Sequence, residues 1–139
     1  MLSQTTFAAT EAETAAAGRD LASRLAPGTT VLLHGDLGAG KTAFVRGLAE
    51  GLGIDPGEVS SPTFTIVQEY RGPRITLQHV DLYRLSPAEV SDLALDDLLD
   101  GATIMAIEWA ERLPREPAPP SILVTLAHQP AGRTITIDG

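Results

Sequence analysis

The segment Gly35–Thr42 has the residue types and the spacing best suited to binding phosphate. It reads Gly-Asp-Leu-Gly-Ala-Gly-Lys-Thr and matches the pattern G-x-x-x-x-G-K-[ST]. Glycines permit backbone angles that turn successive N–H groups toward one phosphate, Lys41 adds a charge for the β- and γ-phosphates, and the Thr42 hydroxyl is a ligand for Mg²⁺. The pattern predicts a phosphate-binding loop for a Mg²⁺-bound nucleotide. Its predicted nucleotide-binding residues are Gly35, Asp36, Leu37, Gly38, Ala39, Gly40, Lys41, Thr42 and Ala43.

Lys41 is the only lysine in the chain, and the other basic residues are all arginine. Guanine-specific GTPases read the base with an N-K-x-D motif, which needs a lysine of its own, so that class is excluded. The L-S-G-G-Q signature of ABC-type ATPases is also missing, and the chain is too short for an AAA-type module. We therefore expect ATP as the nucleotide. We also expect the Lys41 ammonium to face solvent when no nucleotide is bound.

Two acidic residues are candidates for holding the metal and positioning water. Glu108 ends the apolar run 104–108, which fits the rule that P-loop enzymes place a carboxylate at the carboxyl end of a neighbouring strand. Asp81 shares one face of an extended segment with His79 and Tyr83, because side chains alternate along a strand. A solvated edge strand explains that polar face equally well. The predicted catalytic residues so far are Lys41, Asp81 and Glu108, and the predicted metal ligands are Thr42, Glu108 and Asp81.

Three further features each have an ordinary structural explanation. Ser61-Pro62-Thr63 is most simply a turn before a strand. Trp109, the only tryptophan, either stacks near the nucleotide or belongs to the core. The acidic residues between 92 and 100 are most simply a solvated helix face, and we assign them no chemistry.

The elements around the loop predict one α/β domain over residues 1–139. Thr10 and Glu13 form a capping box that opens a helix to about Leu25, and a second helix begins near Lys41. Ser86 caps a shorter helix that continues intermittently to about Leu99. The predicted strands are 30–34, 63–71, 75–84, 103–109, 121–128 and 133–138, with 63–84 forming an antiparallel hairpin. We expect a mixed sheet with a mainly parallel centre, flanked by helices.

The composition limits the possible partners and compartments. The net charge is −8, with 18 acidic and 10 basic residues, so the chain lacks the basic surface that grips nucleic acid. There are no cysteines and no apolar run long enough for a membrane helix. The first residues do not read as a secretory signal. We expect a cytoplasmic protein that meets nucleic acid, if at all, through a partner.

Four segments together resemble the TsaE family, formerly YjeE. They are G-D-L-G-A-G-K-T, S-P-T-F-T-I-V-x-x-Y, H-V-D-L-Y-R-L and I-E-W-A-E, and they occur in this order along nearly the whole chain. The resemblance implies a P-loop ATPase of bacterial tRNA threonylcarbamoyladenosine synthesis. It also implies two protein partners, TsaB and TsaD, which transfer the threonylcarbamoyl group to adenosine 37 and would themselves hold the tRNA.

The resemblance further implies roles for individual residues. Thr42 and Glu108 match Mg²⁺ positions, and Asp81 matches an acidic residue needed for hydrolysis. Thr63 lies in a stretch that behaves like a switch segment, which makes it a fourth catalytic candidate. Trp109 matches a residue beside the nucleotide, and Arg133 matches an arginine that approaches it.

Two other functions remain open from the sequence. The first is a nucleotide-dependent binding module, in which ATP occupancy rather than turnover regulates a partner complex. The second is a small-molecule phosphotransferase, for which Arg71, Arg74, Arg112 and Arg115 would have to form a lid. Their short-turn and proline-rich surroundings make that lid a weak hypothesis.

Overall fold

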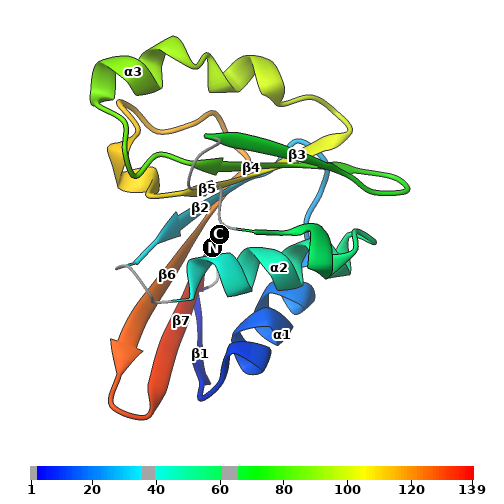
Figure 1. Ribbon diagram of the computed structural model, residues 1–139, viewed down its shortest axis with the longest axis vertical. Coiled ribbons are helices and arrows are strands. Elements are labelled where there is room, and N and C mark those ends of the chain that lie inside the picture. The colour runs from blue at the N-terminus through cyan, green and yellow to red at the C-terminus, as the bar shows by residue number, and fades with distance from the viewer. Residues whose placement is uncertain (1–2, 36–39, 61–65) are drawn as a thin grey trace.

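The computed structural model describes residues 3–35, 40–60 and 66–139, and all its strands form one sheet of seven (Figure 1). The strands are β1 (Ser3–Ala8), β2 (Thr30–His34), β3 (Val67–Arg71), β4 (Thr76–Asp81), β5 (Thr103–Glu108), β6 (Ser121–Gln129) and β7 (Gly132–Asp138). The helices are α1 (Glu11–Ala22), α2 (Lys41–Gly51) and α3 (Pro87–Asp92). Short 3₁₀ turns cover Pro56–Glu58, Leu95–Leu98 and Ala110–Arg112.

The sheet has a parallel centre and antiparallel margins. Its strand order is β1-β7-β6-β2-β5-β4-β3. The four strands β6, β2, β5 and β4 run parallel, whereas β7, β1 and β3 are added antiparallel. The predicted mixed sheet with its hairpin is therefore confirmed. Because the central strands are parallel, the carboxyl ends of β2, β4 and β5 all meet at one edge.

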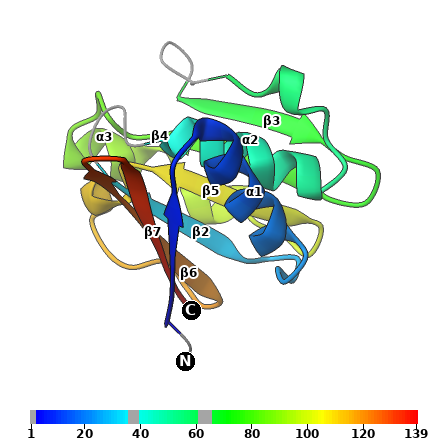
Figure 2. The same ribbon diagram turned by 90° about the horizontal axis from the view of Figure 1, so that it is seen from below.

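Helices α1 and α2 lie side by side across one face of the sheet (Figures 1 and 2). The Thr10 side chain accepts the Glu13 N–H at 3.2 Å, which caps the start of α1 as predicted. Glycine allows the two helices to approach closely: a Cβ on Gly47 would lie 1.8 Å from the carbonyl oxygen of Ala15. The main core forms between these helices and the sheet, with Phe44, Leu48 and Leu33 fully buried.

The opposite face of the sheet has a thinner cover made of α3 and the 3₁₀ turns. Ser86 and Glu89 form the capping box that opens α3, with their two hydrogen bonds at 3.2 and 3.1 Å. A second apolar cluster forms beneath this cover and includes Val90, Met105 and Ile107. No helix within the described ranges is long and apolar enough to cross a membrane.

Several predicted boundaries differ from the structure. The strand Ser3–Ala8 was not predicted, because five of its six residues are exposed and only its pairing with β7 defines it. The helix α1 ends at Ala22, three residues early, and the hairpin strands shorten to Val67–Arg71 and Thr76–Asp81. The first part of the predicted strand 63–71 lies outside the described residues. The domain limits 1–139 stay a prediction.

Candidate nucleotide site

The predicted site residues converge because three parallel strands end together. Glu108 is the last residue of β5, and it pairs in register with Leu33 of β2 on one side and with Asp81 of β4 on the other. The chain leaves β2 at His34 and re-enters regular structure at Lys41, the first residue of α2. Residues far apart in sequence thus meet where the loop Gly35–Thr42 begins and ends. Residues 36–39 of that loop lie outside the described ranges.

Gly40, the N-cap of α2, has a conformation and surroundings that require glycine. Its φ of 101° lies in the left-handed region, where a Cβ would be strained. A Cβ there would also lie 2.6 Å from Nη1 of Arg133 and 3.4 Å from the Cγ2 methyl of Thr14. The start of α2 therefore packs against β7 and α1, and this brings Arg133 to the glycine-rich turn.

Arg133 places a buried hydrogen-bond donor beside Gly40. Its Nε is buried and has no hydrogen-bond partner among the described residues. A buried guanidinium donor without a partner is costly, since such groups are nearly always satisfied. The prediction that Arg133 approaches the site is thus supported by its position next to Gly40.

Lys41 is buried, with 5% of its surface exposed, so the expectation that it faces solvent is wrong. Its Nζ donates to the carbonyl oxygen of Gly35, which closes the two ends of the loop on each other. The same nitrogen lies 4.1 Å from the ring centroid of Trp109, within cation–π range. No pattern in the sequence indicated that Trp109 would contact the lysine.

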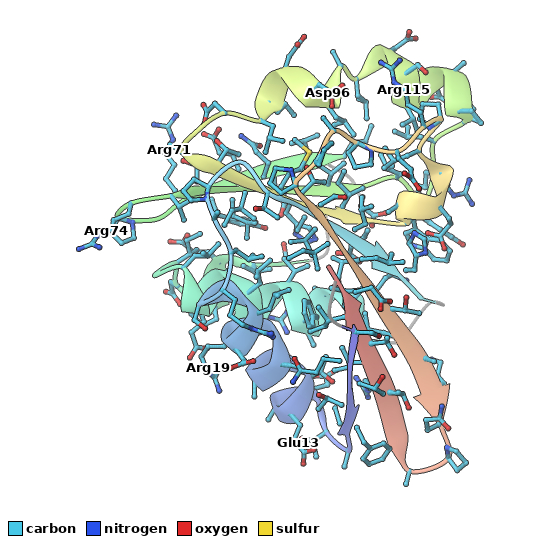
Figure 3. All side chains as sticks on the ribbon, turned by 180° about the vertical axis from the view of Figure 1, so that it is seen from behind. Glu13, Arg19, Arg71, Arg74, Asp96 and Arg115 are labelled. Atoms are coloured by element: carbon cyan, nitrogen blue, oxygen red, sulfur yellow. The ribbon has the colours of Figure 1, made fainter. Side chains whose placement is uncertain are left out.

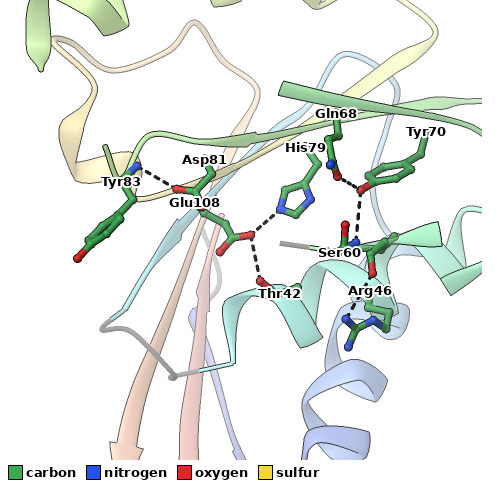
Figure 4. Close-up of polar contacts among 10 residues, drawn as sticks. Thr42, Arg46, Ser60, Gln68, Tyr70, His79, Asp81, Tyr83 and Glu108 are labelled. Atoms are coloured by element: carbon green, nitrogen blue, oxygen red, sulfur yellow. Dashed lines mark hydrogen bonds and ion pairs between the residues drawn. The ribbon is translucent and has the colours of Figure 1, made fainter. Parts of the chain in front are cut away.

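Thr42, Glu108 and His79 form a continuous hydrogen-bonded chain (Figure 4). The Thr42 hydroxyl donates to Oε2 of Glu108 at 3.4 Å, and His79 Nε2 lies 2.5 Å from the same oxygen. A carboxylate oxygen accepts hydrogen bonds, so His79 Nε2 is the donor in this contact. His79 Nδ1 is buried without a partner among the described residues. The contact fixes where the Glu108 carboxylate points.

His79 is the functional candidate that sequence reasoning missed. The alternation of His79, Asp81 and Tyr83 identified one polar strand face, but it did not assign the histidine a role. The alternative of a solvated edge strand is wrong, because β4 lies between β3 and β5 and His79 is fully buried. The informative signal was a histidine two residues before the carboxylate, on the same face.

Asp81 is half-buried beside Glu108. Its Oδ1 accepts the Tyr83 N–H at 2.9 Å. Burial raises the pKa of the Asp81 carboxyl above its ordinary value, and the nearby Glu108 charge adds to this, although the hydrogen bond from Tyr83 opposes it. The carboxyl is therefore a better proton acceptor than an exposed aspartate.

Trp109 belongs both to the site and to the second apolar cluster. It follows Glu108 directly and has φ 60°, a left-handed conformation that turns the chain off the end of β5. Its ring lies 4.8 Å from the Tyr83 ring and 5.9 Å from the Arg112 guanidinium carbon. The core alternative agrees with the packing of Trp109 against the second apolar cluster, and its place beside a nucleotide stays a prediction.

Other predicted residues are not brought together here. Thr63 lies outside the described residues. Arg71 and Arg74 flank the β3–β4 turn, at the amino end of β4 and thus at the sheet edge opposite to Asp81 (Figure 3). Arg115 borders a cavity on the α3 face. The four arginines therefore do not form a common lid. Within the described ranges, no three His, Asp or Glu residues are grouped so that together they could hold a metal ion.

Comparison with known proteins agrees with this geometry. Residues 8–135 match the family described as "Threonylcarbamoyl adenosine biosynthesis protein TsaE". The Synechocystis protein named tRNA threonylcarbamoyladenosine biosynthesis protein TsaE is 52% identical over 105 residues, which cover 73% of this chain and 66% of that protein. The Bacillus subtilis protein of the same name is 46% identical over 108 residues, covering 75% and 67%. The chain thus matches about two thirds of the length of these relatives.

A solved structure has the same fold. The crystal structure of Bacillus subtilis YdiB matches with a TM-score of 0.72 and 34% identity, covering 98% of this chain and 83% of that one. The predicted P-loop NTPase fold is confirmed by this match together with the sheet order. This chain belongs to the TsaE family, which takes part in tRNA threonylcarbamoyladenosine biosynthesis.

Proposed function

We propose that this protein binds and hydrolyses ATP as a component of the system that places threonylcarbamoyl on adenosine 37 of tRNAs reading codons that begin with adenine. One observation carries the proposal. The strand ends bring Lys41, Thr42, Glu108 and Asp81 together at the amino end of α2. A site for binding alone would need no second carboxylate beside the first.

The described residues fit a nucleotide triphosphate at this place. The start of α2 presents N–H groups and the positive end of the helix dipole, which favour phosphate. Lys41 is at the first helical position, where its ammonium could exchange the Gly35 carbonyl oxygen for a phosphate oxygen. The unpartnered Nε of Arg133 supplies a second buried donor that an anion would satisfy.

The oxygen ligands also fit Mg²⁺. Thr42 and Glu108 are already in contact, and both are hard oxygen donors of the kind that Mg²⁺ prefers. Few protein ligands suffice, because Mg²⁺ keeps several waters and takes the rest from phosphates. Mg²⁺ would neutralise charge that develops on the β- and γ-phosphates. Asp81, with its raised pKa, would orient a water and hold its proton.

We propose TsaB and TsaD as the protein partners, with tRNA reached only through them. The net charge of −8 supports the indirect contact with tRNA, because counterion release at basic side chains supplies most nucleic-acid affinity. The proposal places the protein in the cytoplasm, where tRNA modification takes place.

The test measures ATP turnover and the yield of modified tRNA, each with and without the two partners. Glu108→Ala should weaken Mg²⁺-dependent nucleotide binding. Asp81→Asn should retain binding and lose turnover, because asparagine is nearly isosteric but does not accept a proton. Normal turnover in both variants would remove these carboxylates from the mechanism. If Asp81→Asn loses turnover yet supports full modification, the protein is a nucleotide-dependent binding module instead.

A further inference from the structure

The two faces of the sheet are covered unequally. The helices α1 and α2, of 12 and 11 residues, close the first face. On the second face α3 has 6 residues and is followed by a 3₁₀ turn of 4. The chain from Leu113 to Pro117 completes this cover without helix or strand. So short a cover leaves part of the sheet without close packing.

A cavity of about 300 Å³ results between α3, the Leu113–Pro117 segment and the sheet. Its floor is formed by Thr30 of β2 and by Met105 and Ile107 of β5. Protein interiors hold few voids larger than a water molecule, and ligand pockets begin at about this volume. The space is therefore as large as a small ligand pocket.

The walls of the cavity are apolar and its mouth is polar. Val90, Leu95, Leu99 and Leu113 line the walls, while Ser91, Asp96, Arg115 and Glu116 also border the space. Figure 3 shows Asp96 and Arg115 on this side of the molecule, above the sheet. The lining suits an apolar side chain whose neighbours are polar, as at the core and rim of a protein interface.

A residue in the left-handed conformation borders the cavity. Ala94 borders it with φ 50° and ψ 51°, a left-handed conformation uncommon for a residue with a Cβ. This residue separates α3 from the Leu95–Leu98 turn, so the helix does not continue across the sheet. Such strain is often retained where it serves a function.

The charge around the cavity selects the occupant. Between Arg84 and Arg112 the chain contains no basic residue. The same stretch carries six exposed carboxylates on and after α3: Glu89, Asp92, Asp96, Asp97, Asp100 and Glu111. Nucleic acid, anionic lipid and acidic peptides are repelled by this field, whereas Lys and Arg side chains are attracted.

We propose that the cavity between α3 and residues 113–117 is a docking site for a protein segment that inserts apolar side chains flanked by Lys or Arg. This surface lies on the face of the sheet opposite to α1 and α2 and does not depend on the proposed ATP chemistry. It is nevertheless adjacent to the nucleotide site, since Ile107 in the floor precedes Glu108 in β5. A docked segment would thus contact the strand that holds the site carboxylate.

The floor of the cavity contains a convenient reporter. The chain has two methionines, Met1 and Met105, so ¹³C-methyl labelling of methionine yields at most two signals. We would titrate the labelled full chain with a synthetic basic helix of about 12 residues that has Leu at the i, i+3, i+4 and i+7 positions and Lys elsewhere. Matched peptides replace every Lys by Glu, or every Leu by Ser.

Two pairs of variants separate docking from nonspecific attraction. Ser91 and Ala88 are both exposed on α3, but only Ser91 lines the cavity, so Ser91→Phe should plug it and Ala88→Phe should not. Asp96 and Asp92 are both exposed, but only Asp96 lines the cavity, so Asp96→Lys is compared with Asp92→Lys. All four changes are at exposed positions, where they disturb folding little.

We expect the Leu/Lys peptide to shift the Met105 methyl signal and the two matched peptides to leave it in place. Ser91→Phe and Asp96→Lys should each raise the Kd about tenfold or more, and their partners less than about twofold. The proposal is overturned if the signal does not move at about 1 mM peptide. It is equally overturned if the Glu peptide binds as well, or if both members of each pair bind alike.

Discussion

Replacing His79 tests how the Glu108 carboxylate is held in place. His79 is fully buried, and its Nε2 donates to Oε2 of Glu108 at 2.5 Å. Glu108 is 3% exposed, and the other hydrogen bond to Oε2 within the described residues is the long one from Thr42, at 3.4 Å. In His79→Leu the carboxylate loses its short bond and is free to turn away from Thr42.

The expected change in the free energy of unfolding follows from what each of the two ring nitrogens of His79 contacts. A hydrogen bond to a charged group contributes about 1.5–3 kcal/mol, and a buried unsatisfied polar atom costs about 1–3 kcal/mol. Leucine removes the unsatisfied Nδ1, which offsets part of the loss, but it leaves the buried Glu108 carboxylate without its short donor, so the free energy of unfolding should fall by about 1–3 kcal/mol. The Mg²⁺-dependent part of ATP affinity has no such offset and should fall about 10- to 100-fold.

The assay is a titration of ATP followed by Trp109 fluorescence, with Mg²⁺ or with EDTA, beside a thermal melt. His79→Gln is the matched control, because its amide nitrogen reaches about as far as Nε2 and keeps a donor toward Glu108. We expect the leucine variant to lose affinity in Mg²⁺ and to keep it in EDTA, and the glutamine variant to recover most of the loss. Unchanged affinity in Mg²⁺, or an equal loss in EDTA, would refute the reasoning.

Three other expectations follow from the same geometry. Burial raises the pKa of Asp81 above 3.8, so between that value and the folded-state pKa the folded chain holds more protons and loses stability as pH rises. Asp81→Asn should therefore melt higher than the wild type at neutral pH without Mg²⁺, and this gain should vanish below about pH 3.8 in melts over a pH series. Gly47→Ala should destabilise the fold by about 3 kcal/mol or more in urea unfolding, since the new Cβ would lie 1.8 Å from the Ala15 carbonyl oxygen; a smaller loss would mean that the two helices shift easily. Fluorescence of Trp109, the single tryptophan, should change when Mg²⁺ and ATP are added, because the ring covers the Lys41 ammonium; a flat signal with binding shown by calorimetry would contradict this.

Local sequence determined the elements whose signals lie within a few residues. The run Thr30–His34 is apolar and bounded by turn residues, and it forms the predicted strand without change of bounds. Thr10 and Ser86 cap the predicted helices, because a cap depends only on the next three residues. The loop motif likewise located Lys41 and Thr42, since the lysine, the hydroxyl and the glycines are adjacent in the chain.

Tertiary structure alone decided what depends on distant residues. The strand Ser3–Ala8 has no apolar pattern and exists through its pairing with β7. Lys41 contacts Trp109, 68 residues further along, and His79 bonds to Glu108, 29 residues further along. Neither contact leaves a local pattern, because each is made where parallel strands end side by side and the order of strands in the sheet is not written in any one segment. The cavity beneath α3 arises in the same way, from a helix too short for the sheet that it covers.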